Sequence, residues 1–160
     1  MFMYTVRATS LRFALVLVLS VSVLVLLLLF GGGESVYAMA DGEVIHYSGV
    51  RTKEERMDFL KQFGIEVKEE SEQTENFTVS ETLDRVLLSY NELQKKQGLD
   101  LSKYTGKRLV RYTYEVTNCE RDGTVYVNLF VSRGRVVAGD VSGEGDAEFV
   151  IALCDFIHKK

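Results

Sequence analysis

Proline and tryptophan are absent from this chain of 160 residues, which also has only two cysteines and two histidines. Because there is no proline, turns and domain boundaries must be inferred from the 13 glycines. Neither cysteine belongs to a CxxC or other metal-type spacing, and His46 and His158 do not complete one. The sequence therefore indicates neither a structural metal site nor a cofactor.

The longest apolar run extends from Phe13 to Phe30 and contains no polar residue other than Ser20 and Ser22. An α-helix rises about 1.5 Å per residue and needs roughly 18 apolar residues to cross the hydrocarbon of a bilayer. The run meets that length and lacks the polar face of a helix on a soluble core. We therefore expect residues 13–33 to form a transmembrane helix or signal-anchor that contacts the lipid bilayer.

The charges beside this run predict its orientation. Arg7 and Arg12 precede it, whereas Glu34 and Asp41 follow it, and the positive flank of a membrane helix stays in the cytoplasm. We expect residues 1–12 to be cytoplasmic and the rest of the chain to be extracytoplasmic, as in a single-pass protein of the cell membrane.

A cleaved secretory signal is the alternative. Glycines at 31–33 would break the helix, and Ala38-Met39-Ala40 offers small residues to a signal peptidase. The apolar core is longer than the roughly 7 to 15 residues of a signal peptide, which favours an uncleaved anchor. Both alternatives export the remainder of the chain.

The exported part is acidic, since it holds all 23 Asp and Glu residues but only 17 of the 19 Lys and Arg residues. Nucleic acid is therefore not an expected partner. Cys119 and Cys154 would lie in a compartment where a disulfide can form. Two unrelated thiols are the alternative, because the sequence does not show that their Cα atoms come within bridging distance.

The exported part begins with a linker at residues 34–50, in which 43–47 is either a short strand or linker, and the domain is expected at 51–160. Thr52 and Glu55 form a capping box that starts the first helix of the domain. The next segments are predicted to be a helix end at Gly64, a strand at 65–67, an acidic loop at 68–76 and a helix from its N-cap Ser80 through Gln97.

Alternating apolar residues predict a meander of three antiparallel strands after this helix. The strands are expected at 108–118, 124–132 and 135–141, with turns at Asp122-Gly123 and Arg133-Gly134 and a last helix at 148–158. The aliphatic face of the middle strand, which begins with Val125, is expected to pack on the helix at 80–97. The predicted fold class is α+β, in which an antiparallel sheet, made of this meander and a helix–strand unit, packs against helices.

Several segments resemble a bacterial family that is catalogued only as a domain of unknown function, family 4830. They are RTKEER at Arg51–Arg56 with the following FLKQFGIEV, then YNELQKKQGLDLSKYTGK and RYTYEVTN. The resemblance covers about Arg51 to Val141. It implies one N-terminal membrane helix and one extracytoplasmic α+β domain, and it implies no catalytic residue.

Polar and aromatic side chains on the three meander strands form the candidate binding face. They are Arg111, Tyr112, Tyr114, Asn118, Asn128, Arg135 and Asp140. Such a face could hold a peptide or an anionic group by arginine pairing and aromatic stacking. The alternative is ordinary sheet packing, since Tyr112 and Tyr114 follow the strand period and Arg111 with Glu115 suits a cross-strand ion pair.

The sequence contains no catalytic motif. No serine lies in a GxSxG elbow, and paired carboxylates such as Glu69-Glu70 are neighbours on a solvated segment. We therefore expect a membrane-tethered extracytoplasmic binding or regulatory module, with an envelope protein or peptide as partner, rather than an enzyme. The alternative function is a secreted envelope protein released by signal cleavage, including a small hydrolase.

Overall fold

The computed structural model describes residues 16, 18–23, 25, 37–40, 43–121, 123–144 and 149–157. The chain divides into two units, Met1–Glu34 and Ser35–Lys160. The described residues of the first unit are helical, but most of the expected membrane segment lies outside the described residues. Within the described part of the chain, no helix is both long enough and apolar enough to cross a membrane.

Five strands form the main sheet of the second unit in the order β3-β4-β5-β6-β7, each antiparallel to its neighbour. They are β3 (Gln73–Thr78), β4 (Arg108–Glu115), β5 (Thr124–Ser132), β6 (Arg135–Glu144) and β7 (Phe149–Ala152). A separate hairpin pairs β1 (Tyr37–Ala40) with β2 (Glu43–His46). The α+β class and the antiparallel meander predicted from the sequence are confirmed, in a larger sheet than expected.

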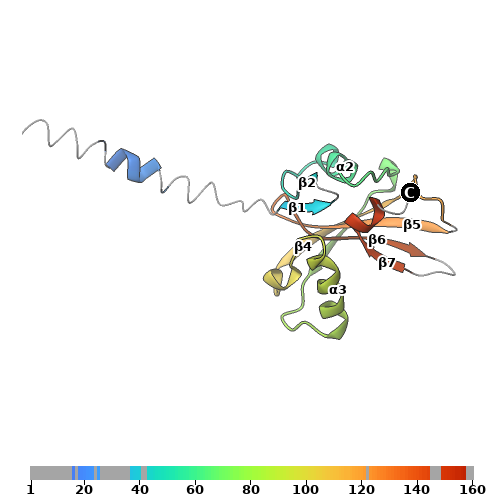
Figure 1. Cartoon of the computed structure of the whole chain (residues 1–160). Coiled ribbons are helices and arrows are strands. Elements are labelled where there is room, and N and C mark those ends of the chain that lie inside the picture. Colours follow the sequence, from blue (N-terminus) through green and yellow to red (C-terminus); the bar gives the residue numbers. More distant parts are fainter. Residues whose placement is uncertain are drawn as a thin grey trace, which may run out of the picture. The chain divides into compact units, whose positions relative to one another are not determined.

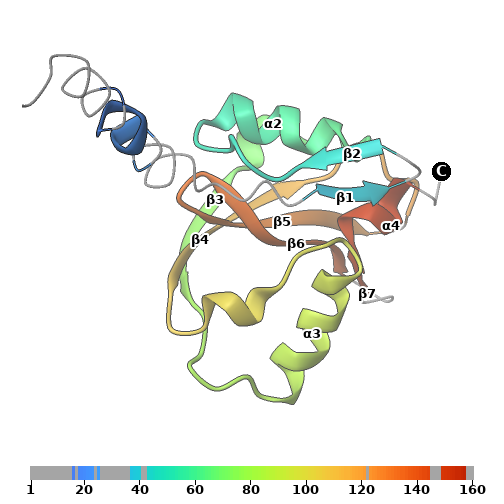
Figure 2. The ribbon, with the colours of Figure 1, turned by 60° about the vertical axis from the view of Figure 1, so that its left-hand side comes forward.

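Helices cover both faces of this sheet (Figures 1 and 2). The helices are α2 (Lys53–Lys61), α3 (Arg85–Lys95) and α4 (Leu153–Ile157), with 3-10 turns η1 (Glu69–Ser71) and η2 (Leu101–Tyr104). The predicted capping box starts α2, because Thr52 Oγ1 accepts from Glu55 N and the Glu55 carboxylate accepts from Thr52 N. α2 and α3 lie on opposite sides of the sheet, so the domain has three layers.

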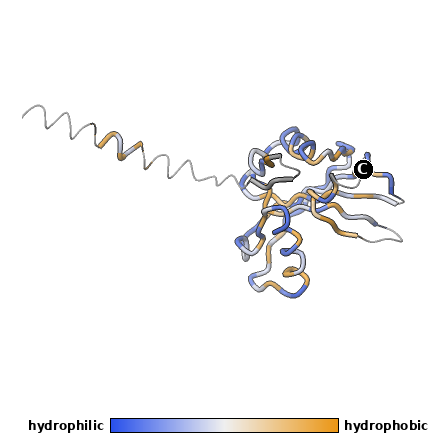
Figure 3. The backbone as a smooth tube through the Cα atoms, viewed as in Figure 1, coloured by the Kyte–Doolittle hydropathy of each residue, from blue (hydrophilic) through white to orange (hydrophobic). Residues whose placement is uncertain are grey.

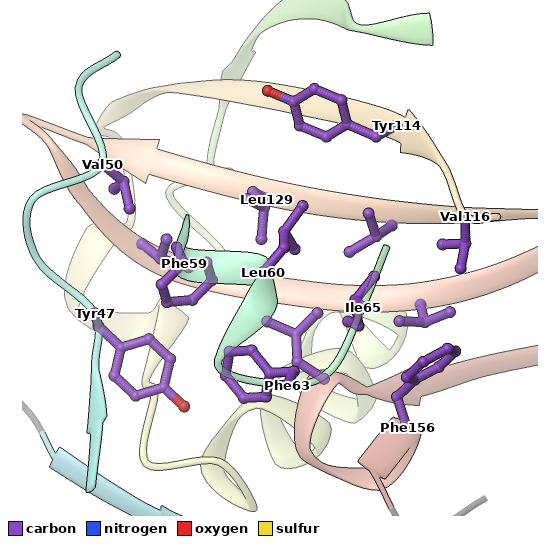
Figure 4. Close-up of a cluster of buried hydrophobic side chains, with 14 of the residues drawn as sticks. Tyr47, Val50, Phe59, Leu60, Phe63, Ile65, Tyr114, Val116, Leu129 and Phe156 are labelled. Atoms are coloured by element: carbon purple, nitrogen blue, oxygen red, sulfur yellow. The ribbon is translucent and has the colours of Figure 1, made fainter. Parts of the chain in front are cut away.

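The larger apolar cluster lies between the sheet and α2 (Figure 4). Phe59, Leu60 and Phe63 come from α2 and its C-terminal turn and are almost fully buried. They pack against the aliphatic face of β5, which includes Val127 and Leu129, and against Phe156 of α4. The expectation that this face packs on the helix at 80–97 is therefore wrong.

α3 instead packs on the other face of β5. Phe130 of that face contacts Tyr90 of α3 and Phe77 of β3 edge-on, with ring centroids 6.2 and 5.3 Å apart. Hydrophobic residues follow the central strands, whereas α2 and α3 combine hydrophobic and hydrophilic residues (Figure 3). α3 therefore covers the mixed face of β5, where Phe130 is the aromatic residue that contacts it.

Three other predicted elements are corrected by the structure. The acidic loop at 68–76 contains η1 and most of β3, and the helix at 148–158 is a short strand, β7, followed by α4. The second helix begins later than predicted, because Asp84 rather than Ser80 is its N-cap and accepts from Leu87 N.

Two segments around α2 also differ from expectation. The strand predicted at 65–67 is reduced to an isolated bridge between Val67 and Val116. The segment 34–50 contributes more than a linker, since Ile45, Tyr47 and Val50 are buried in the core of the second unit.

Two buried glutamines replace a missing strand partner beside β6. The ladder between β6 and β7 ends at the pair Asp140 and Ala152, so the next residue of β6, Gly139, has no β7 partner. Its N–H donates to Gln94 Oε1 at 2.8 Å, and its carbonyl accepts from Gln97 Nε2 at 2.7 Å. Gln97 Oε1 also accepts from Leu153 N, at 2.9 Å.

We predict that Gln97→Met lowers the free energy of unfolding by about 2–5 kcal/mol, because the thioether leaves a buried N–H and a buried carbonyl without partners. Gln73→Met on exposed β3 is the control and should change it by less than about 0.5 kcal/mol. Chemical denaturation of the full chain, followed by circular dichroism, measures both. If Gln97→Met and Gln73→Met changed the free energy of unfolding by the same amount, the role assigned to Gln97 would be contradicted.

Candidate binding site

The residues predicted to form one binding face lie on opposite sides of the sheet. Arg111, Asn128 and Asp140 lie on the α3 face, where Arg111 acts electrostatically on Tyr90 of α3. Tyr112 and Tyr114 lie on the α2 face and pack against the larger apolar cluster. Because successive residues of a strand point to opposite faces, Arg111 and Tyr112 cannot line one surface.

On the α3 face, Asp140 is the centre of a buried polar network. Its carboxylate accepts from Tyr90 Oη at 2.6 Å and from Asn128 Nδ2 at 2.9 Å, and Asn128 Oδ1 accepts from Thr113 Oγ1 at 2.7 Å. Burial raises the pKa of Asp140, although these hydrogen bonds and the charge of Arg111 act against it. The Tyr90–Asp140 hydrogen bond fastens α3 to the sheet, so the buried Asp140 carboxylate is engaged within the fold rather than presented to a ligand.

On the α2 face, Arg56 is buried and holds a second polar network. Its Nε donates to Tyr114 Oη at 2.8 Å, and its Nη2 lies 2.9 Å from Glu72 Oε2. Tyr114 Oη also donates to the Glu72 carboxylate. Burial acts to raise the pKa of Glu72, but the hydrogen bonds from Tyr114 and Arg56 outweigh it and lower that pKa. Arg56 also lies over the Tyr112 ring, with Cζ 3.7 Å from its centroid.

The remaining candidates have separate positions. Arg135 starts β6 opposite Ser132, and Asn118 holds the backbone of the α2–β3 connection through Glu66 N and Gly64 O. Cys119 and Cys154 are free thiols in the structure.

An open depression lies on the α2 face beside the β5–β6 turn. We call it the arginine depression; its volume is about 480 Å³ and it is lined by Val50, Arg51, Val110, Tyr112, Val131, Arg133 and Gly134. Its walls are apolar or aromatic except for the two arginines. It is therefore a shallow surface on which two guanidinium groups adjoin an aromatic ring.

Backbone contacts bring Arg51 and Arg133 together. Gly134 O accepts from Gly49 N at 3.0 Å and from Val50 N at 3.1 Å, so the segment before α2 is held on the β5–β6 turn. A Cβ on Gly134 would lie 2.5 Å from Arg51 Cγ, which shows how closely the Arg51 stem packs on the turn.

The conformation of Arg133 is unusual. Arg133 and Gly134 form the predicted two-residue turn, with φ of 50° and 76°. Positive φ at both positions is the type I′ pattern, which favours Asn-Gly. Arg133 is the only non-glycine residue with positive φ among those the structure describes.

The two arginines of the depression form no ion pair within the described residues. The nearby Glu55 carboxylate is engaged by the backbone N–H groups of Arg51 and Thr52. The charge of Arg51 also acts on Glu55 and helps to lower its pKa. The depression therefore presents the positive charge of Arg133, beside an Arg51 whose charge is shared with Glu55, to an anionic group.

Sequence reasoning missed both arginines of the depression. Arg51 appeared only within the resemblance, and Arg133 only as a turn residue. The signal that was available is Arg133 itself, since arginine is not a residue that a type I′ turn favours.

The buried Asp140 and the half-buried Glu72 predict opposite pH effects on stability. The folded-state pKa of Asp140 is raised, so its favourable contribution is complete below the unfolded-state pKa and is lost as pH rises through the folded value. The pKa of Glu72 is lowered, so its contribution exists above the unfolded-state pKa and is lost as pH falls.

Urea denaturation of Asp140→Asn and Glu72→Gln across pH 3.5–7.5 tests this pair, over a range set roughly by the ordinary carboxyl pKa values. Relative to the unsubstituted chain, Asp140→Asn should become more stable as pH rises, and Glu72→Gln less stable. Differences that do not vary with pH would contradict both assignments.

Comparison with known proteins gives one family and no described activity. The model of the domain of unknown function DUF4830 matches residues 59–141, just over half of the chain, from within α2 to within β6. No curated protein and no solved structure matches the chain. The matched residues include most of the depression but not Val50 or Arg51. On this match, the chain belongs to the DUF4830 family.

Proposed function

We propose that this protein is an exported, membrane-tethered module that binds an anionic group of an envelope partner in the arginine depression. The proposed tether is the apolar run at residues 13–33, and its positive N-terminal flank supports an extracytoplasmic position for the domain that follows. The second unit begins at Ser35, directly after that run.

The observation that carries the binding proposal is the backbone of Arg133. A left-handed conformation costs a non-glycine residue about 1–2 kcal/mol, and asparagine would suit this turn better. Such outliers concentrate at functional sites, because the side chain there has a role that outweighs the local cost. Arg133 lines an open surface beside a second arginine, which supports a role in holding a ligand.

The chemistry of the depression suits a carboxylate or phosphate. A guanidinium group offers several N–H donors in a planar fork and binds such anions by paired hydrogen bonds. Tyr112 and Val131 add apolar contact next to the charge. Asp140, a buried carboxyl with a raised pKa, lies on the opposite face of the sheet, so it cannot act on a ligand there. The arrangement therefore supports binding rather than catalysis.

We predict that Arg133→Asn raises stability and weakens anion binding. The free energy of unfolding should rise by about 1 kcal/mol, since asparagine tolerates positive φ. Affinity for inorganic phosphate should fall about tenfold, equivalent to about 1.4 kcal/mol. Phosphate titration of the isotope-labelled full chain in detergent, with the amide resonances of Val50 and Gly134 as reporters, measures the affinity.

Arg85→Gln is the matched control, because it removes one exposed guanidinium on α3, across the sheet from the depression. It should leave phosphate affinity unchanged, whereas Arg51→Gln should weaken it. Phosphate affinity that is unchanged in both Arg133→Asn and Arg51→Gln would refute the proposed site.

Topology gives a separate prediction. Protease added outside intact cells should remove an epitope placed after Lys160, while a cytoplasmic marker stays whole. The intact mass of the membrane-bound protein should include residues 1–12. A protected epitope would show that the orientation is wrong, and a mass beginning at Met39 or Asp41 would favour the released form instead.

A further inference from the structure

We propose that the ligand of the arginine depression is an extended acidic peptide that pairs with β3 as a sixth strand of the sheet. This inference rests on the proposed function, because it names the class of partner whose anionic group the depression holds. It combines two features of the same region: an open strand edge and an unpaired positive charge beside it.

β3 is an open edge of the sheet (Figure 2). It is the first strand in the order, β4 is its one partner strand within the described part of the chain, and five of its six residues are exposed. An edge strand presents N–H and C=O groups that another extended segment can pair with. Natural edges are commonly protected by charged residues, Pro or a bulge. The sequence QTENFT has no Lys or Pro, its one charge, Glu75, is paired with Arg111, and its ladder with β4 is regular. β3 is therefore competent for strand addition.

The other edge of the sheet is less suitable. β7 has four residues, and the chain turns directly from Ala152 into α4. Where β7 ends, Gln94 and Gln97 already bond the backbone of β6 at Gly139. Strand addition is thus favoured at β3.

The register of β3 connects this edge to the depression. Thr74 pairs with Tyr112 and Asn76 pairs with Val110, so these four residues share the α2 face. Tyr112 and Val110 line the depression. Neighbouring strands lie about 4.8 Å apart, so an added strand would run about 10 Å from β4. Side chains of its α2 face would project beside Thr74 and Asn76, toward the depression.

Charge selects an acidic peptide for this position. Arg51 and Arg133 line the depression, and the exposed Arg108, which pairs with Thr78 of β3, lies on the same α2 face. Glu75 of β3 points to the α3 face and pairs with Arg111. A carboxylate on the α2 face of the peptide would therefore lie nearest to Arg108, and Arg51 and Arg133 add positive charge farther from the edge on the same face. The chain as a whole carries a net charge of −4, but distant charges are screened beyond about 8 Å at physiological salt, so the local charge dominates.

A second copy of this chain fits the same edge less well. If β3 paired with its counterpart, the side chains offered to the depression would be Thr74 and Asn76, which carry no charge. The Glu75 carboxylates of the two copies would also approach each other on the α3 face, which is unfavourable. A separate acidic segment is therefore the better occupant.

Fluorescence anisotropy of a labelled seven-residue peptide, with alternating Thr and Glu and blocked ends, tests the inference on the full chain in detergent. We expect the peptide to bind, and we expect its N-methylated form, which has the same charge but no backbone N–H donors, to bind at least about tenfold more weakly. Asn76→Glu, which puts a negative charge on the α2 face of β3, should weaken binding. Thr82→Glu, an equal charge on an exposed residue outside the strand, should not.

The outcomes separate this inference from the proposed function. If the N-methylated peptide binds as well as its parent while Arg133→Asn abolishes binding, the depression holds anions but strand addition is wrong. Absence of peptide binding, with phosphate binding retained, would also overturn strand addition alone. Peptide affinity that is unaffected in both Arg133→Asn and Arg51→Gln would refute the arginine site. Sedimentation that shows a dimer lost in Asn76→Glu would assign the edge to a second copy and overturn the peptide.

Discussion

The buried side-chain amide of Gln97 is the contact on which the arrangement of the second unit depends. Its Nε2 donates to the backbone carbonyl of Gly139 in β6, and its Oε1 accepts from the backbone N–H of Leu153 at the start of α4. The backbone carbonyl of Gln97 accepts from Tyr47 Oη at 2.6 Å. These groups belong to segments far apart in the sequence, and each would be an unsatisfied buried group without its partner. Although Gln94 Nε2 has no partner among the described residues, the cluster joins α3 to the β6–β7 side of the sheet.

These polar contacts explain which parts of the sheet are covered by helices and which remain exposed. α3 is held by Gln97 near β6 and by the Tyr90–Asp140 hydrogen bond, and α2 is held by Arg56 and its partners on β4. Both helices therefore cover the centre of the sheet. The outer edge of β3 and the β5–β6 turn lie outside these contacts, so ligand-accessible backbone and charge remain there.

Short sequence patterns correctly predicted the elements that are stabilised by contacts between residues close in the sequence. The capping box at Thr52, the alternation of β4 and the turn at Arg133 each depend on residues that are neighbours in sequence or in one hairpin. β3 was missed because its residues are polar and exposed, and it becomes a strand only by pairing with β4. The prediction of which helix covers which face of β5 was wrong for a related reason. An aliphatic face can pack against α2 or α3 equally well, and the polar contacts that decide between the two helices join residues far apart in the sequence.

The residue types of the candidate site could be predicted from the sequence, but their positions could not. The sequence indicated arginine and tyrosine on a sheet, yet Arg111 and Tyr112 are adjacent in one strand and so point apart. The depression instead needs Arg51, which reaches the β5–β6 turn only because Val50 N and Gly49 N bond Gly134 O. A left-handed arginine stands there, a second arginine lines the same depression, and the unpaired edge of β3 lies beyond β4 on the same sheet. A sequence tends to conflict with local rules where function requires it, and one bound acidic strand would neutralise the charges and pair the edge together.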